Sequence, residues 1–407
     1  MAPVGSFESL SAAIQAGADS VYFGLEHLSM RSKSSLNFTI DDLKTITTRC
    51  RDNGMKTYLT LNTVMFDQDI PLMKKLVDAA KENEVSALIA SDQSVIDYGR
   101  SQGMVIHLST QINISNYSAL KFYAPYADVV VLARELNLEQ VAEIARQIGA
   151  DQLKGPSGQL IRLEMFAHGA LCMATSGKCY MSLHRYNSSA NRGACLQGCR
   201  RSYIVTEKET GDELLIDNEY IMSPKDLSTI GFVDKLLAAS VGLLKIEGRA
   251  RPPEYVKTTV SCYKEAVQSV FDGTYSQEKI LAWTERLKTV FNRGFWDGYY
   301  LGRKLGEWSK VYGSEATRRK VYLGKGMNYF DRLGVAEFLM ETKELEVGDE
   351  ILVTGPTTGV LQFVIDEMRV DDQLVQKVEK GIRFSIKTDQ KIRRSDKLYK
   401  WVEAKRI

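Results

Sequence analysis

Four of the chain's six cysteines and two of its four histidines lie in one window, from Glu164 to Arg200. The cysteines are Cys172, Cys179, Cys195 and Cys199, with the spacing C-x6-C-x15-C-x3-C. Glycines and other small residues separate them, so the backbone can fold tightly around a compact group. Four thiolates can hold a zinc ion in a tetrahedron or bind a [4Fe–4S] cluster. We therefore interpret the window as a four-thiolate metal site.

The spacing alone does not identify the bound group. Structural zinc sites usually combine two C-x2–4-C turns, and only Cys195 and Cys199 have that spacing here. An iron–sulfur cluster, a zinc ion and redox-active thiols are all consistent with the pattern. Cys50 and Cys262 lie inside helical patterns, where they are expected to be small core residues.

A second set of charged residues lies in the segment L243-L-K-I-E-G-R249. In a strand, Lys245, Glu247 and Arg249 point to one face. Charges that face the inside of a barrel need partners or a ligand, so both a buried ion-pair network and an anion-binding site fit this pattern. An arginine fork suits a carboxylate, and Arg31, in the loop after an earlier strand, would add a second one.

The sequence gives little support for a peptidase site. It contains neither the H-E-x-x-H motif of zinc peptidases nor the G-x-S-x-G motif of serine hydrolases. Cys172 with His168, or Cys179 with His184, can be paired as nucleophile and base. Either pair would remove one thiol from the group of four.

Alternating strand and helix patterns are expected to position these residues. Apolar or β-branched runs predict strands, amphipathic stretches predict helices, and their six repeats predict a parallel sheet. The predicted strands are 20–24, 56–62, 87–91, 105–109, 128–133, 160–166 and 242–247, and the predicted helices are 7–16, 40–53, 71–82, 93–102, 116–123 and 138–148. No G-x-G-x-x-G turn is present, so we favour a TIM-like barrel over an open, doubly wound sheet. The first strand, before or at Ala2-Pro3, is expected to be very short or missing.

Polar side chains follow the carboxyl ends of successive predicted strands. They include Asn62, Gln111, Arg134, His168, Glu247 and Arg249. In a barrel these ends converge on one mouth, where catalytic loops lie. Any one of these residues could be only a helix cap or a loop residue, but their recurrence predicts a site.

The regular alternation breaks twice. A Cys-rich insertion of about residues 167–222 interrupts the barrel, and Ser223-Pro224-Lys225-Asp226 after it predicts a helix start. We expect the barrel with its insertion to span 1–275 and a helical, aromatic-rich linker to span 276–317. From 318 to 407 short strands alternate with turn signals, which predicts a small antiparallel β-barrel.

Basic residues are concentrated near the end of this second domain. They are Lys391, Arg393, Arg394, Lys397 and Lys400, with the aromatic residues Tyr399 and Trp401 interleaved. A solvated edge strand explains such a run, and so does a surface that binds RNA phosphates with aromatic support. The net charge of the chain, +2, gives no general argument for nucleic acid.

The start of the chain lacks the basic and apolar regions of a signal peptide. The longest apolar runs are strand-sized, far below the roughly 18 residues of a membrane helix. We therefore expect no membrane association and a reducing, cytoplasmic setting. In such a setting, clustered cysteines more often bind metal or do chemistry than form disulfides.

The segment E164-M-F-A-H-G-A-L-C-M-A-T-S-G-K-C-Y-M-S182 resembles the signature of the collagenase-like peptidases of unassigned catalytic type, the "U" class. A2-P-V-G-S6, G17-A-D-S-V-Y-F-G24, K245-I-E-G-R249 and F291-N-R-G-F295 resemble other landmarks of this family, so the similarity covers nearly the whole chain. For part of the family, the resemblance implies hydroxylation without molecular oxygen, an iron–sulfur cluster on four cysteines, and prephenate as hydroxyl source. The layout is most similar to members that convert the wobble uridine of certain tRNAs to 5-hydroxyuridine.

The resemblance assigns the cluster ligands, and the charged and polar residues at the strand ends are expected to fill the other roles. The cluster ligands would be Cys172, Cys179, Cys195 and Cys199. Arg31, Lys245 and Arg249 would hold the dicarboxylate prephenate, with Asn62, Gln111 and Arg134 also at the substrate site. His168 or Glu247 would handle protons. The alternatives are a collagenase-like peptidase and a zinc-stabilised RNA-binding protein without catalysis.

Overall fold

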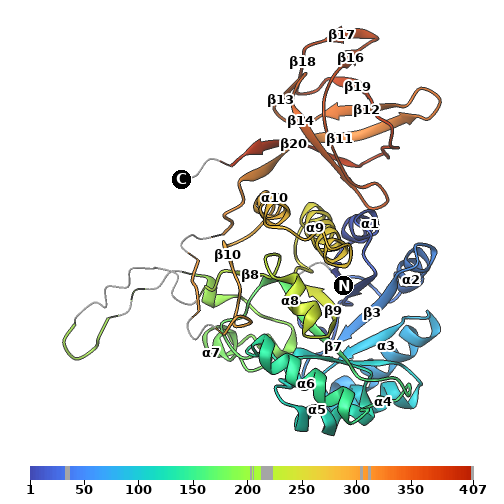
Figure 1. The fold of residues 1–407 in the computed structure, drawn as a ribbon. Helices are drawn as coiled ribbons and strands as arrows, with labels where there is room; N and C mark the ends of the chain where they lie inside the picture. Colours follow the sequence, from blue (N-terminus) through green and yellow to red (C-terminus); the bar gives the residue numbers. More distant parts are fainter. Residues whose placement is uncertain are drawn as a thin grey trace.

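The computed structural model describes residues 1–32, 37–201, 204, 206–211, 223–302, 306–309 and 313–404. It contains a parallel α/β barrel followed by an antiparallel β domain (Figure 1), which confirms the predicted fold class. Among the described helices, none is both long and apolar enough to cross a membrane.

Eight parallel strands form the barrel. In order around it they are β1 (Ala2–Pro3), β2 (Ser20–Phe23), β3 (Lys56–Leu61), β4 (Ala87–Ala90), β5 (Ile106–Leu108), β6 (Val129–Val131), β7 (Arg162–Ala170) and β9 (Val241–Ile246). All seven strands predicted from the sequence are present at these positions. β1 is very short, as expected, and the backbone of Met1 joins it to β9. Ile246 N donates to Met1 O at 3.1 Å, and Met1 N donates to Leu244 O at 2.8 Å, so the barrel closes.

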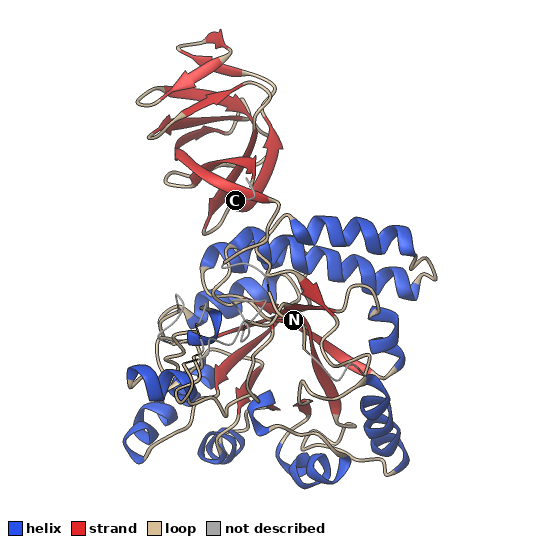
Figure 2. Cartoon of the chain, turned by 90° about the vertical axis from the view of Figure 1, so that its left-hand side faces the viewer, coloured by secondary structure: helices blue, strands red, loops and turns tan. Residues whose placement is uncertain are grey.

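Helices surround the barrel on its outer side (Figure 2). They are α1 (Phe7–Gln15), α2 (Leu43–Asp52), α3 (Ile70–Glu82), α4 (Gln93–Ser101), α5 (Tyr117–Tyr123), α6 (Leu138–Ala150), α8 (Val233–Ala238), α9 (Pro253–Phe271) and α10 (Gln277–Lys288). The side chains of Ser6, Asp92 and Asn137 each accept a backbone N–H in the first turn of α1, α4 and α6. These caps satisfy donors that have no partner within the helix and fix where it begins.

The helix predicted to start at Ser223-Pro224 is wrong. This segment instead leads into strand β8 (Asp226–Ser228), which pairs with the end of β7 and with β10 (Phe295–Trp296). Lys225 N donates to Glu307 O and Asp226 N to Gly294 O, so these donors are used across strands and not along a helix. Part of the segment expected to be a linker, β10, therefore belongs to the barrel sheet.

The second domain has an antiparallel sheet and its own apolar core. The sheet order is β15 (Gly359–Val364), β14 (Glu350–Gly355), β20 (Lys397–Glu403), β11 (Arg318–Phe330), β12 (Val335–Met340), β19 (Arg383–Lys387), β16 (Met368–Val370) and β17 (Gln373–Val375), and β13 (Glu344–Glu346) pairs separately with β18 (Lys377–Glu379). Phe338, Phe384 and Leu398 are buried in its core. Helices α1 and α9 both contact this domain. The side chain of Gln15 on α1 donates to Thr358 O at 2.8 Å and accepts from Val360 N at 2.9 Å, and Lys257 Nζ on α9 donates to Val360 O at 2.8 Å.

Lys245, Glu164 and His107 form a cluster of ionisable side chains inside the barrel. Lys245 Nζ, on β9, donates to Glu164 Oε1, on β7, at 2.8 Å, and His107 Nδ1, on β5, lies 3.5 Å from Glu164 Oε2. All three are less than a twentieth exposed. Burial would raise the pKa of Glu164, but Lys245 and His107 outweigh it and lower the pKa to about 2. The carboxylate is therefore ionised, and the pair depends on both charges.

We predict that Glu164→Gln destabilises the fold by about 3–5 kcal/mol at neutral pH, because it leaves the Lys245 ammonium buried without its partner. Urea unfolding followed by circular dichroism measures this loss. The control is Glu164→Gln combined with Lys245→Met, which removes both charges and should recover most of the stability. Equal losses in the single and double variants would contradict a role for the charge pair.

The same pair predicts a dependence on acid. The pKa of Glu164 falls from an ordinary 4.5 to about 2 on folding, so its ionised form contributes stability above pH 4.5. That contribution is lost as the pH falls from 4.5 towards 2. In the variant that combines Glu164→Gln with Lys245→Met, the free energy of unfolding should not fall over this pH range through this pair.

Candidate active site

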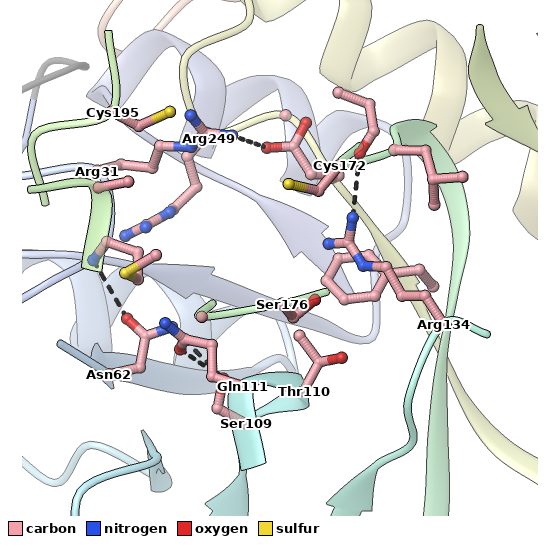
Figure 3. A pocket seen from close by; sticks show the side chains of 18 of the residues that line it. Arg31, Asn62, Ser109, Thr110, Gln111, Arg134, Cys172, Ser176, Cys195 and Arg249 are labelled. Carbon is pink, nitrogen blue, oxygen red and sulfur yellow. Dashed lines mark hydrogen bonds and ion pairs between the residues drawn. The ribbon is translucent and has the colours of Figure 1, made fainter. Parts of the chain in front are cut away.

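The carboxyl ends of the barrel strands and the cysteine segment together enclose a cavity of about 240 Å³ (Figure 3). The six residues predicted to bind a small anion all line it. They are Arg31, Asn62, Gln111, Arg134, Lys245 and Arg249. The barrel topology explains this convergence, because parallel strands end on the same side.

The cavity carries a large excess of positive charge. Among the described residues that line it, seven are cationic and one, Glu247, is a carboxylate. The cations are Arg31, Arg134, Arg200, Lys245, Arg249, Arg251 and Arg293. Such a surface favours an anionic ligand.

Arg249 is buried without a carboxylate partner among the described residues. Its Nη1 donates to Thr60 Oγ1 at 2.8 Å and lies 3.4 Å from Ser29 Oγ. Burial lowers the pKa of Arg249 to about 10, so it remains charged near neutral pH. Gly24 makes room for the guanidinium, because a Cβ there would lie 2.4 Å from Arg249 Nη1.

Arg134 lies across the cavity from Arg249 in Figure 3. Its guanidinium stacks over Phe166, 3.9 Å from the ring centroid, and Nη1 donates to Ala170 O at 3.3 Å. Its buried Nε has no hydrogen-bond partner in the described part of the chain. Arg134 and Arg249 thus offer two guanidinium groups that no described carboxylate neutralises.

Glu247 forms an ion pair with Arg31 at 3.2 Å. Burial would raise the pKa of Glu247, but Arg31, Arg251 and other arginines outweigh it and hold the pKa below its ordinary value. Glu247 is therefore ionised and can accept a proton but not donate one. This restricts the proton-handling role predicted for it.

His168 does not line the cavity. It is buried beside Tyr263, whose hydroxyl lies 3.4 Å from His168 Nδ1 and donates to Ala167 O at 2.8 Å. Strand alternation from Glu164 and Phe166 would have placed His168 inside the barrel, but the pairing of β7 with β9 shifts register between Phe166 and His168. Burial lowers the pKa of His168 to about 3, so it stays neutral. The structure does not bring His168 together with the other predicted site residues.

The four predicted metal ligands line the same cavity as the arginines. Cys172 is exposed, the other three are half-buried, and all four are free thiols. Burial raises the pKa of Cys199, and its three neighbours Cys172, Cys195 and Cys179 add to this effect. The number and type of donors suit a four-thiolate group, although no three metal-binding side chains among the described residues lie close enough together to hold an ion as placed.

Arg200 ties the cysteine segment to the barrel. Its guanidinium donates to Leu171 O at 2.7 Å, to Pro224 O at 2.7 Å and to Ser223 Oγ at 3.2 Å. Leu171 and Pro224 lie at the two ends of the cysteine segment, the insertion between β7 and β8, so this one side chain holds both ends together. A second contact, from Asn113 Nδ2 to Ser176 O at 3.0 Å, fixes the segment over β5.

The sequence reading missed Arg200, Arg251 and Arg293, which also line the cavity. Arg251 follows Arg249 by two residues, and Arg293 lies in the F291-N-R-G-F295 segment. Arg251 continues the series of every second residue that begins with Lys245, so the same pattern could have predicted that it faces the cavity. Nothing local in the sequence indicates that Arg293 meets the barrel mouth, because that depends on the pairing of β10 with β8.

The basic residues predicted to bind RNA do not line the cavity. Lys391 pairs with Asp331 at 2.8 Å, and Lys400 pairs with Asp349 at 2.6 Å. Lys391, Arg393 and Arg394 border a separate shallow hollow with Tyr329, whereas Lys397 is exposed on β20. The role of these residues in RNA binding stays a prediction.

Comparison with known proteins places the chain among relatives of similar length. It is 60% identical over 401 residues to a protein named collagenase from Porphyromonas gingivalis strain W83, covering 98% of this chain and 97% of the relative. It is 32% identical to tRNA hydroxylation protein P of Helicobacter pylori strain 26695, covering 74% and 71%, and 28% identical to tRNA hydroxylation protein P1 of Bacillus subtilis, covering 90% and 86%.

The family described as peptidase family U32 matches residues 5–310, which include the barrel from α1 onwards and the cysteine segment. This agrees with the resemblance read from segment 164–182. The chain belongs to peptidase family U32.

Proposed function

We propose that this chain is a tRNA-modifying enzyme that hydroxylates the wobble uridine to 5-hydroxyuridine without molecular oxygen. The observation that carries the proposal is that four free thiols and several arginines without carboxylate partners line one small cavity. Relatives named tRNA hydroxylation protein share this family and most of the chain length.

In this proposal, Cys172, Cys179, Cys195 and Cys199 hold a [4Fe–4S] cluster. A bound cluster supplies one-electron chemistry that protein side chains lack. Zinc is the alternative occupant, since it binds the same donor set but is not redox-active. The setting would be cytoplasmic, where thiols stay reduced.

Arg249 and Arg134 would bind the two carboxylates of prephenate. Each guanidinium offers donors within the same cavity, and an arginine–carboxylate contact fixes orientation as well as charge. Lys245 is paired with the ionised Glu164, so it would not be a main carboxylate ligand. Glu247, ionised beside Arg31, would accept a proton during the reaction.

A collagenase-like peptidase is the second candidate, favoured by the name of the relative that is 60% identical. The cavity gives it little chemical support. None of the chain's four histidines, all of them among the described residues, lines the cavity with the thiols. A cysteine nucleophile there would lack an imidazole base.

We predict that deleting the gene removes 5-hydroxyuridine and its derivatives from tRNA, as measured by mass spectrometry of nucleosides. Expression of the wild-type chain should restore them. Arg249→Gln should not, because it removes the buried cation from the cavity, whereas Arg146→Gln on the exposed face of α6 should restore them fully. Unchanged tRNA in the deletion strain would reject the proposed function.

We predict that protein purified without oxygen contains about four irons and matching sulfide per chain. Cys172→Ala and Cys195→Ala should each lose most of the iron. The matched controls are Cys50→Ala and Cys262→Ala, which remove thiols buried in α2 and α9 and should keep it. A colourless protein with one zinc would contradict the iron–sulfur assignment.

The peptidase alternative predicts a different result. Wild-type protein should then cleave gelatin, and one cysteine substitution should abolish cleavage while the other three do not. Our proposal predicts no gelatin cleavage above that of a heat-inactivated sample.

A further inference from the structure

Two arginines at the edge of the cavity share one aromatic ring. Arg251 stacks over Phe291 with its guanidinium carbon 3.5 Å from the ring centroid, and Arg293 lies 5.1 Å from the same centroid. Gly248 shapes this arrangement, since a Cβ there would lie 2.6 Å from Tyr255 and 3.1 Å from Arg251 Cγ. The Phe291 ring positions both cations. It contacts the flat face of the Arg251 guanidinium, so the N–H groups at the edge of that guanidinium stay available for hydrogen bonds.

The hydrogen-bonding edges of these guanidinium groups are largely unused. Arg251 donates no side-chain hydrogen bond to any described residue. Arg293 contacts one carboxylate, that of the buried Asp226, at 3.4 Å. Among the described residues, Asp226 is the one carboxylate in an ion pair with these two guanidinium groups, and the nearby Glu247 is already paired with Arg31. The three arginines therefore outnumber the two carboxylates, and buried or half-buried charge of this kind calls for an anionic partner.

Arg200, which also lines the cavity, differs because its guanidinium already donates hydrogen bonds to Leu171, Pro224 and Ser223. These bonds hold the cysteine segment in place. Arg249 and Arg134 form the other pair of unneutralised guanidinium groups and approach the cavity from β9 and from the loop after β6. The cavity therefore has two pairs of guanidinium groups that described carboxylates do not fully neutralise.

We propose that Arg251 and Arg293 bind the RNA phosphodiester next to the target nucleotide. This inference rests on the proposed function. An enzyme that acts on one base must bring that base out of its stack, and the adjacent phosphate then needs a fixed anchor. A guanidinium fork binds a phosphate through two parallel hydrogen bonds, and a stacked, weakly hydrated arginine loses little on binding. The base would enter the cavity while the phosphate stays at its edge.

The test is a double-mutant cycle between protein and RNA, with the full-length chain purified without oxygen. The probe is a fluorescent anticodon stem-loop with a wobble uridine, and its affinity is measured by anisotropy. The protein variants are Arg251→Gln and Arg293→Gln, with Arg146→Gln on α6 as control. The RNA variant replaces the phosphate flanking the uridine with an uncharged methylphosphonate.

We expect each arginine substitution to weaken binding of the normal RNA about tenfold, the typical effect of one charge-assisted contact. The methylphosphonate should weaken binding to the wild type and to Arg146→Gln by more than either single arginine substitution, because it removes both contacts. Its effect on Arg251→Gln should be clearly smaller, because only the Arg293 contact remains to be lost. Arg251→Lys keeps the charge without the fork and should fall between wild type and Arg251→Gln.

Three results would overturn the inference. The first is an equal methylphosphonate effect in the wild type and in Arg251→Gln. The second is a loss of iron in Arg251→Gln and Arg293→Gln, which would show that the arginines balance the thiolates. The third is weaker prephenate binding with unchanged RNA binding, which would assign them to the small-molecule site.

The proposed function fails on a different measurement. If 5-hydroxyuridine persists in the deletion strain while the cycle shows coupling, the phosphate site stands and the hydroxylation is rejected. If 5-hydroxyuridine is lost but the cycle shows no coupling, the hydroxylation stands and the phosphate site is rejected.

Discussion

The arrangement of the barrel mouth depends on one buried contact, between Lys245 and Glu164. These residues lie on adjacent parallel strands, where Glu164 pairs with Leu243 and Phe166 with Lys245. A shift of one residue would turn every side chain of β9 to the other face. Lys245 would then lose its only described carboxylate, which makes such a shift costly. The ion pair therefore fixes the register that carries Glu247 and Arg249 to the mouth. A charge pair suits this task better than two apolar residues, because apolar contacts tolerate more than one register.

Much of this could be predicted from local pattern. The period of two along K245-I-E-G-R249 predicts one face for Lys245, Glu247 and Arg249, and the repeated β/α units predict that strand ends meet. The strands of the second domain, from β11 to β20, follow the same local signals, apart from the short β13, β16, β17 and β18. His168 shows where the approach fails. It follows a predicted strand and is expected at the mouth with the other polar residues, but a register shift against β9 places it beside Tyr263 on α9. That shift depends on a partner strand about 80 residues away in the sequence.

The excursion between β7 and β9 shows the same limit. Ser223-Pro224 has the local features of a helix start, yet the backbone donors after it bond to Gly294 and Glu307, far along the chain. The resulting strands β8 and β10 bring Arg293 and Phe291 to the mouth. Sequence reading therefore found the site residues on the barrel strands themselves and missed those delivered by long-range pairing. It also could not show that Arg200 holds the two ends of the excursion together.

The size and charge of the cavity bear on the two functions that names in this family suggest. A collagen-like substrate is an extended chain, and a peptidase needs a groove that accepts several consecutive residues. The cavity here, about 240 Å³, is smaller than the roughly 300–1,000 Å³ typical of sites for drug-sized ligands. Three of the seven cations in its walls have carboxylate partners, and the other four form no ion pair with a described carboxylate. A largely uncharged peptide segment would not neutralise these four. A small anion would supply the missing negative charge. The size and charge of the cavity thus favour a small anionic ligand over a polypeptide.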